Sequence, residues 1–173
     1  PATHFMPVCG VLGIIALNHH QSLSSFSSTL SSSMIQVVQS LQLSPSSPAL
    51  MTATLRFLAN YISHSPLMTP DQQMEVLDLC SSCNNQQIPE MSRHAAVSVV
   101  LNLCICIKHQ LSMDSVSQIL SFLATLLKSE TSYDVIGTAL LALGTLIWGD
   151  SPEIMGLAAS IDVPKAVQSW ISS

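Results

Sequence analysis

The sequence predicts an all-α fold, a right-handed solenoid built from about four helical repeats. Three observations predict it. An apolar segment recurs every 42 residues, amphipathic segments lie between the recurrences, and hydrophobic residues make up 48% of the 173 residues while aromatic residues make up only 5%. A core of aliphatic side chains with so few aromatic ones suits packed helices better than a β-sandwich.

The apolar segment ends at the same point of every period. It ends at Asn18, Asn60, Asn102 and Gly144, each 42 residues after the one before. Because each segment is apolar on nearly all sides, we expect a helix that is buried in the stack, with the terminal asparagine hydrogen-bonded to backbone of the adjoining repeat. A period of this length is typical of armadillo and HEAT repeats.

Amphipathic segments predict the remaining helices. Aliphatic side chains recur at spacings of three and four, the pattern of a helix with one buried face, over residues 21–41, 71–80 and 114–127. A Ser or Thr that can cap a helix stands before a proline that can begin one at Ser47-Pro48, Thr69-Pro70 and Ser151-Pro152. Short polar loops are expected at residues 84–91 and 129–133.

Composition argues against nucleic-acid binding and against a membrane-spanning protein. The net charge is −5 and the five Lys and Arg residues are scattered, which gives no basic surface for nucleic acid. The mean hydropathy of +0.47 is high. The longest apolar runs, residues 8–17 and 95–107, are nevertheless shorter than the roughly 18–20 residues that span a bilayer.

Five cysteines at irregular spacing favour a reducing compartment, so we expect a cytoplasmic or nuclear protein.

No group of residues predicts catalysis or metal binding. Cys80 and Cys83 have CxxC spacing, but a zinc site needs four ligands and no second cluster follows. Cys104 and Cys106 lie in the most apolar segment and are expected in the core. Cys9 has histidines nearby but lacks the third residue that orients a catalytic base. We therefore expect no enzymatic activity, no metal and no cofactor.

Two arginines are candidates for ligand contact. Arg56 stands in an otherwise apolar segment, so its charge must either pair with an acidic residue or face the groove of the solenoid. Both alternatives stay open for Arg56, and Arg93 is the second candidate. The concave face of a helical solenoid is where an extended peptide commonly binds.

Residues 139–147, followed by Gly149-Asp150-Ser151, resemble the C-terminal repeat of PUL domains. These are the armadillo-type domains of phospholipase A2-activating protein and its relatives. Further similarities lie at residues 5–8, 55–60 and 101–104, so the resemblance covers most of the chain. It predicts a single domain over residues 1–173, cut from a larger protein.

The resemblance implies a protein-interaction domain that acts in ubiquitin-dependent protein handling. PUL domains bind the acidic, aromatic-containing C-terminal tail of the AAA ATPase valosin-containing protein. Two family arginines that face the tail correspond here to Gly13 and Thr138, whereas Arg56 matches a family arginine and Arg93 lies near a family histidine. The implied peptide-binding groove therefore comprises Gly13, Arg56, Asn60, Arg93, Asn102 and Thr138.

Two functions remain open. The domain is either an adaptor that binds the ATPase tail or a similar chain end, or a structural or oligomerising scaffold whose groove has lost that ligand. Gly13 and Thr138 make the groove less cationic than the family pattern, so the fold implied by the resemblance is firmer than the acidic ligand.

Overall fold

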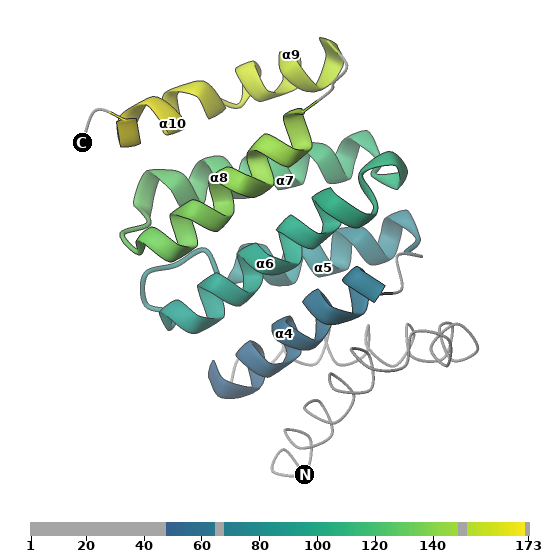
Figure 1. The fold of residues 1–173 in the computed structure, drawn as a ribbon, viewed down its shortest axis with the longest axis vertical. Coiled ribbons are helices and arrows are strands. Elements are labelled where there is room, and N and C mark those ends of the chain that lie inside the picture. Colours follow the sequence, from purple (N-terminus) through teal and green to yellow (C-terminus); the bar gives the residue numbers. More distant parts are fainter. Residues whose placement is uncertain (1–47, 65–67, 149–151, 172–173) are drawn as a thin grey trace.

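Pairs of helices build the part of the chain that this computed structural model describes, residues 48–64, 68–148 and 152–171 (Figure 1). The front layer consists of three helices that lie side by side: α4 (Pro48–His64), α6 (Glu90–Cys106) and α8 (Tyr133–Ile147). The layer behind contains α5 (Pro70–Ser82) and α7 (Met113–Ser129). The segments that end at Asn60, Asn102 and Gly144 thus lie in one layer, as predicted.

The chain closes with two short helices, α9 (Pro152–Ser160) and α10 (Val163–Ile171), and α10 packs against α7. A 3-10 turn at Lys108–Gln110 follows α6. The described residues contain no strand, and the prediction of an all-α helical repeat solenoid is confirmed. The segment ending at Asn18 and the amphipathic segment 21–41 lie outside the described residues.

Side-chain hydrogen bonds connect residues that are about one repeat apart. They span 37 positions between Arg93 and Glu130, 43 between Asn102 and Ala59, and 44 between Thr138 and His94. These spans bracket the 42-residue period. Contacts limited to the neighbouring repeat are the defining property of a solenoid.

Helix starts follow the predicted capping residues. Thr69 caps α5, because its hydroxyl accepts the backbone N–H of Gln72 at 3.3 Å while the Gln72 side chain accepts the N–H of Thr69 at 2.9 Å. Pro48 and Pro152 are the first residues of α4 and α9, as predicted. The predicted loop 84–91 ends earlier, because α6 begins at Glu90, where a carboxylate is favourable in a first helical turn.

The core lies between the two layers and is almost wholly aliphatic. Cys104, expected in the core, is buried, and the CxxC cysteines Cys80 and Cys83 are buried at the end of α5. No helix among the described residues has the length and apolarity needed to cross a bilayer. The largest fully buried side chains are Leu55, Leu58, Ile62, Leu77, Leu79, Leu103, Ile107, Ile119, Leu120, Leu123, Leu126 and Leu127.

The expectation that the apolar segments are buried on all sides is wrong for α6 and α8. Ile105 is 57% exposed and Leu141 is 58% exposed. The second layer covers only one side of each front helix, so apolar residues on the opposite side meet solvent (Figure 1). These exposed apolar side chains belong to a surface rather than to the core.

The predicted bond of Asn102 is present. Its Nδ2 atom on α6 donates to the carbonyl oxygen of Ala59 on α4 at 2.8 Å. We expect Asn102→Leu to lower the free energy of unfolding by about 1–3 kcal/mol, because the partly buried hydrogen bond between α6 and α4 would be lost. Urea unfolding measures the change. Ser98→Ala is the control, since Ser98 donates only to His94 within α6. An unchanged urea midpoint in Asn102→Leu would show that this bond contributes nothing.

Candidate functional site

The outward side of the front layer carries most of the predicted groove residues. We call this surface the front face and define it by exposed or half-buried residues of α4, α6 and α8, together with Trp148 directly after α8: Arg56, Asn60, His94, Ser98, Asn102, Ile105, Thr138, Leu141, Gly144 and Trp148. Four predicted groove residues, Arg56, Asn60, Asn102 and Thr138, lie on it. Gly13 lies outside the described residues.

Arg56 provides a positive charge on the front face. Its side chain is exposed on α4, one helical turn before Asn60. The structure records one ion pair among the described residues, and it does not involve Arg56. Of the two alternatives left open by the sequence, the exposed position argues against a buried structural pair and leaves the charge facing solvent.

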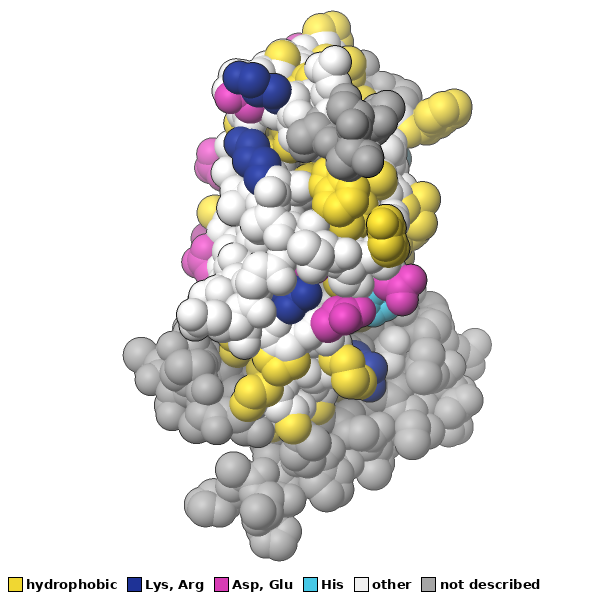
Figure 2. Space-filling model, turned by 90° about the vertical axis from the view of Figure 1, so that its left-hand side faces the viewer, with side chains coloured by type: hydrophobic (Ala, Val, Ile, Leu, Met, Phe, Trp, Pro, Cys, Tyr) yellow, Lys and Arg dark blue, Asp and Glu magenta, His cyan; other side chains and the backbone are white. Residues whose placement is uncertain are grey.

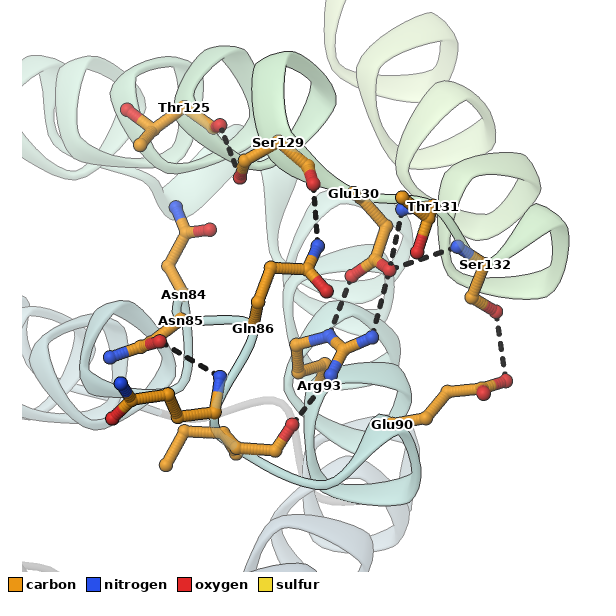
Figure 3. A network of polar contacts seen from close by, with 12 residues as sticks. Asn84, Asn85, Gln86, Glu90, Arg93, Thr125, Ser129, Glu130, Thr131 and Ser132 are labelled. Carbon is orange, nitrogen blue, oxygen red and sulfur yellow. Dashed lines mark hydrogen bonds and ion pairs between the residues drawn. The ribbon is translucent and has the colours of Figure 1, made fainter.

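Arg93, by contrast, is buried, with 7% of its surface exposed. Its Nε donates to Glu130 Oε2 at 2.7 Å and its Nη2 donates to Glu130 Oε1 at 2.9 Å (Figure 3). Nη1 donates to the carbonyl of Ile88. The prediction placed Arg93 in the groove, but the structure makes it a link between the start of α6 and the turn that precedes α8. Its charge therefore faces Glu130 and not a ligand.

The same carboxylate also fixes the turn between α7 and α8. Glu130 Oε1 accepts the backbone N–H groups of Thr131 and Ser132, each at 2.9 Å. Burial raises the pKa of Glu130, but the hydrogen bonds from Arg93 and from these two N–H groups outweigh it and lower the pKa to about 2. Ser132 also donates to Glu90 at 2.8 Å, which extends the network to the first turn of α6 (Figure 3).

Thr138 lies at the contact of α6 and α8. Its hydroxyl donates to the carbonyl of Asp134 at 2.8 Å and hydrogen-bonds to Nε2 of His94 at 3.3 Å. The edge at which α6 and α8 begin carries acidic and apolar side chains together, with Glu90, Asp134 and Tyr133 exposed (Figure 2). A neutral residue at position 138 adds no positive charge to this edge, and the nearby Arg93 is already paired with Glu130.

An apolar pocket opens at the other end of α6 and α8. It is an open depression of about 690 Å³, lined by Cys104, Ile105, Lys108, His109, Leu140, Leu141, Gly144, Thr145 and Trp148. The ammonium group of Lys108 donates to the carbonyls of Thr145 at 3.0 Å and Trp148 at 2.6 Å, where it offsets the negative end of α8. Sequence reasoning missed the pocket. The available signal was Gly144, which stands at the position that asparagine occupies in the two preceding repeats.

The buried thiols are poor nucleophiles. Burial raises the pKa of Cys83 to about 11 and that of Cys104 to about 12, and burial together with the neighbouring Cys83 raises the pKa of Cys80. A thiolate is the reactive form, and these surroundings disfavour it. Within the described residues, no three His, Cys, Asp or Glu side chains are grouped so that they could hold a metal ion.

Comparison with known families identifies the domain. The family model of the PUL domain matches residues 1–173, which is the whole chain. The chain belongs to the PUL domain family. No curated protein and no solved structure matches it. The resemblance seen in the sequence is therefore confirmed over the full length, and this PUL domain is a member of a family of protein-interaction domains.

The Arg93–Glu130 pair predicts acid lability. The folded-state pKa of Glu130, about 2, lies below its ordinary value of 4.5. The carboxylate therefore stabilises the fold fully above pH 4.5, and this contribution is lost as pH falls toward 2. We expect the loss to reach about 3 kcal/mol, measured by urea unfolding at several pH values.

Glu130→Gln should remove most of that pH dependence and lower stability at neutral pH, because Arg93 would remain buried without a counter-charge. Asp114→Asn, on an exposed first turn of α7, is the control and should leave the pH dependence in place. A wild-type stability that is constant from pH 5 to pH 2.5 would contradict this account of Glu130.

Proposed function

We propose that this PUL domain binds an extended peptide at the end of a partner chain, such as the acidic, aromatic-containing C-terminal tail of valosin-containing protein. The observation that carries the proposal is the composition of the front face. It has an exposed arginine on α4 and an apolar pocket between α6 and α8. A peptide that crosses the three helices can reach both features, because α6 lies between α4 and α8 (Figure 1).

The charges on this face favour an acidic ligand at particular places. Arg56 offers a charge on α4, and Lys108 and His109 border the pocket. Among the residues that the structure describes, no aspartate or glutamate lines the pocket. The acidic edge with Glu90 and Asp134 would repel an acidic peptide, so the peptide's carboxylates should lie nearer to Arg56 and the pocket.

Affinity should be modest. A hydrogen bond to a charged group contributes about 1.5–3 kcal/mol, and about 1.4 kcal/mol corresponds to a tenfold change in affinity. Gly13 and Thr138 stand where the family pattern has arginines, so two such bonds are absent. Binding would then depend on Arg56 and on apolar contacts, and it should weaken as salt concentration rises.

The cellular role that follows is that of an adaptor. Binding to the ATPase tail would bring the protein to the ubiquitin-dependent machinery of the cytoplasm or nucleus. We propose that the domain acts by binding alone, without catalysis, which agrees with the raised thiol pKa values of Cys83 and Cys104.

A second candidate is a scaffold that has lost the tail ligand. The exposed apolar side chains of Ile105, Leu141 and Trp148 favour it, since such side chains can also pack against another protein surface. The absence of arginine at position 138 also favours a scaffold, because it removes a charge that would bind an acidic tail. Titration with the tail peptide separates the two candidates.

A labelled peptide with the tail sequence of valosin-containing protein should bind weakly, as measured by fluorescence anisotropy at low and moderate salt. Arg56→Ala should weaken binding about tenfold or more, and Thr138→Arg should strengthen it by a similar factor, because each changes one charge-assisted hydrogen bond. Lys165→Ala on α10 is the control and should leave affinity unchanged.

Two results would contradict the proposal. Tight binding that is unaffected by Arg56→Ala would show that the tail binds elsewhere on the domain. No binding by either the wild type or Thr138→Arg would favour the scaffold.

A further inference from the structure

The acidic edge of the front layer combines carboxylates with exposed apolar side chains. It consists of Glu90 and Met91 at the start of α6 and of Tyr133 and Asp134 at the start of α8. Tyr133 is 84% exposed and Met91 is 57% exposed. These two residues are 42 positions apart, so they are equivalent in neighbouring repeats and lie at the same edge of the layer (Figure 2).

Helix chemistry explains the carboxylates of this edge but not its apolar side chains. An acidic residue in the first turn of a helix is stabilised by the partial positive charge of that helix end. Tyr133 and Met91 gain nothing from this charge, and both leave most of their apolar surface in water. Exposed apolar side chains that are rimmed by polar ones are typical of a surface that binds another protein.

The fold holds Tyr133 in place although its ring is exposed. The ring meets that of Trp170 edge to face, with 6.5 Å between the centroids and 70° between the planes. Trp170 is anchored in turn, because its Nε1 donates to the carbonyl of Leu127. The turn before Tyr133 is fixed as well, because the backbone N–H of Ser132 donates to the carboxylate of Glu130. A ring that is already positioned loses little conformational freedom when a ligand covers it.

The charge of the edge favours a cationic ligand. Glu90 and Asp134 are exposed, and the ion pair recorded among the described residues involves neither of them. That pair joins Arg93 to Glu130, so the positive charge of Arg93 is already balanced inside the fold. The edge therefore places negative charge beside an exposed aromatic ring.

We propose that the acidic edge is a second interaction surface, which binds an arginine side chain of a partner protein. The guanidinium group lies on the ring of Tyr133, whose face attracts a cation, and donates to the carboxylate of Asp134. Glu90 adds a second negative charge, and Met91 contacts the apolar part of the bound segment. Arginine suits this surface better than lysine, because its planar group can stack on a ring and form hydrogen bonds at the same time.

This surface goes beyond the proposed function and does not depend on it. The ligand proposed for the front face is acidic, and the apolar pocket lies at the other end of α6 and α8. The acidic edge takes a ligand of the opposite charge, so one domain could hold two partner segments at once.

The test is an NMR titration of the isotopically labelled domain with three short peptides: acetyl-Arg-Leu-Arg-amide, acetyl-Lys-Leu-Lys-amide and acetyl-Gln-Leu-Gln-amide. The backbone signals of Glu90 and Met91 and the indole N–H signal of Trp170 report binding. The arginine peptide should shift these signals at low salt, the lysine peptide should bind more weakly, and the glutamine peptide should leave them unchanged. Moderate salt should weaken the binding of both cationic peptides, because it screens exposed charges.

Two substitutions remove the proposed contacts separately. Tyr133→Ala and Asp134→Asn should each weaken binding of the arginine peptide by about threefold or more. Tyr133→Phe keeps the ring and should bind as the wild type does. Asp114→Asn is the matched control, because it removes the same charge from the first turn of α7 in the rear layer.

The absence of any shift with the arginine peptide would overturn the inference, as would equal binding by the wild type, Tyr133→Ala and Asp134→Asn. Equal affinity for the lysine peptide would overturn the choice of arginine. Shifts of the same signals when the domain alone is diluted would assign the edge to a second copy of this chain in place of a partner. Failure of the tail peptide to bind would remove the proposed function and leave this inference standing.

Discussion

The packing of α6 between α4 and α8 is the constraint on which the rest of this domain depends. Each front helix contacts the helix one repeat away, and the layer of α5 and α7 covers these helices on one side. This arrangement produces both the core and the exposed surface of the front layer. Behind the front layer lies an aliphatic core, and on its outward side lies a surface that combines Arg56 with the exposed side chains of Ile105 and Leu141.

Polar bonds between repeats set the register of this packing. Asn102 to Ala59 and Arg93 to Glu130 connect neighbouring repeats in the front layer and at its edge. A buried ion pair adds little net stability, because the desolvation of both charges opposes their attraction, but losing one partner is costly. The pair therefore matters chiefly through the cost of losing one partner. Because its guanidinium is buried and donates to Glu130 and to the carbonyl of Ile88, Arg93 is not available to a ligand.

Much of the fold could be predicted from the sequence, because a repeat displays its period directly. The asparagine register at Asn60 and Asn102, the prolines that begin helices and the Asn102 bond all follow from local chemistry. The site was harder to predict. Apolar composition cannot tell which side of α8 faces solvent, so Leu141 was expected in the core, and no local pattern links Arg93 to Glu130. Gly144 was visible as a departure from the register, but the pocket that it lines depends on the packing of α6 against α8.

The central claim is that ligands bind the front face, and photo-crosslinking tests it most directly. A tail peptide carrying a benzophenone group is irradiated with the domain, and the attachment sites are mapped by mass spectrometry. Attachment should fall on α4, α6 and α8 near Arg56, Ile105 and Leu141, and excess unlabelled peptide should suppress it. Suppressible attachment confined to the exposed side of α5 and α7, near Asp78 or Ser121, would contradict the claim.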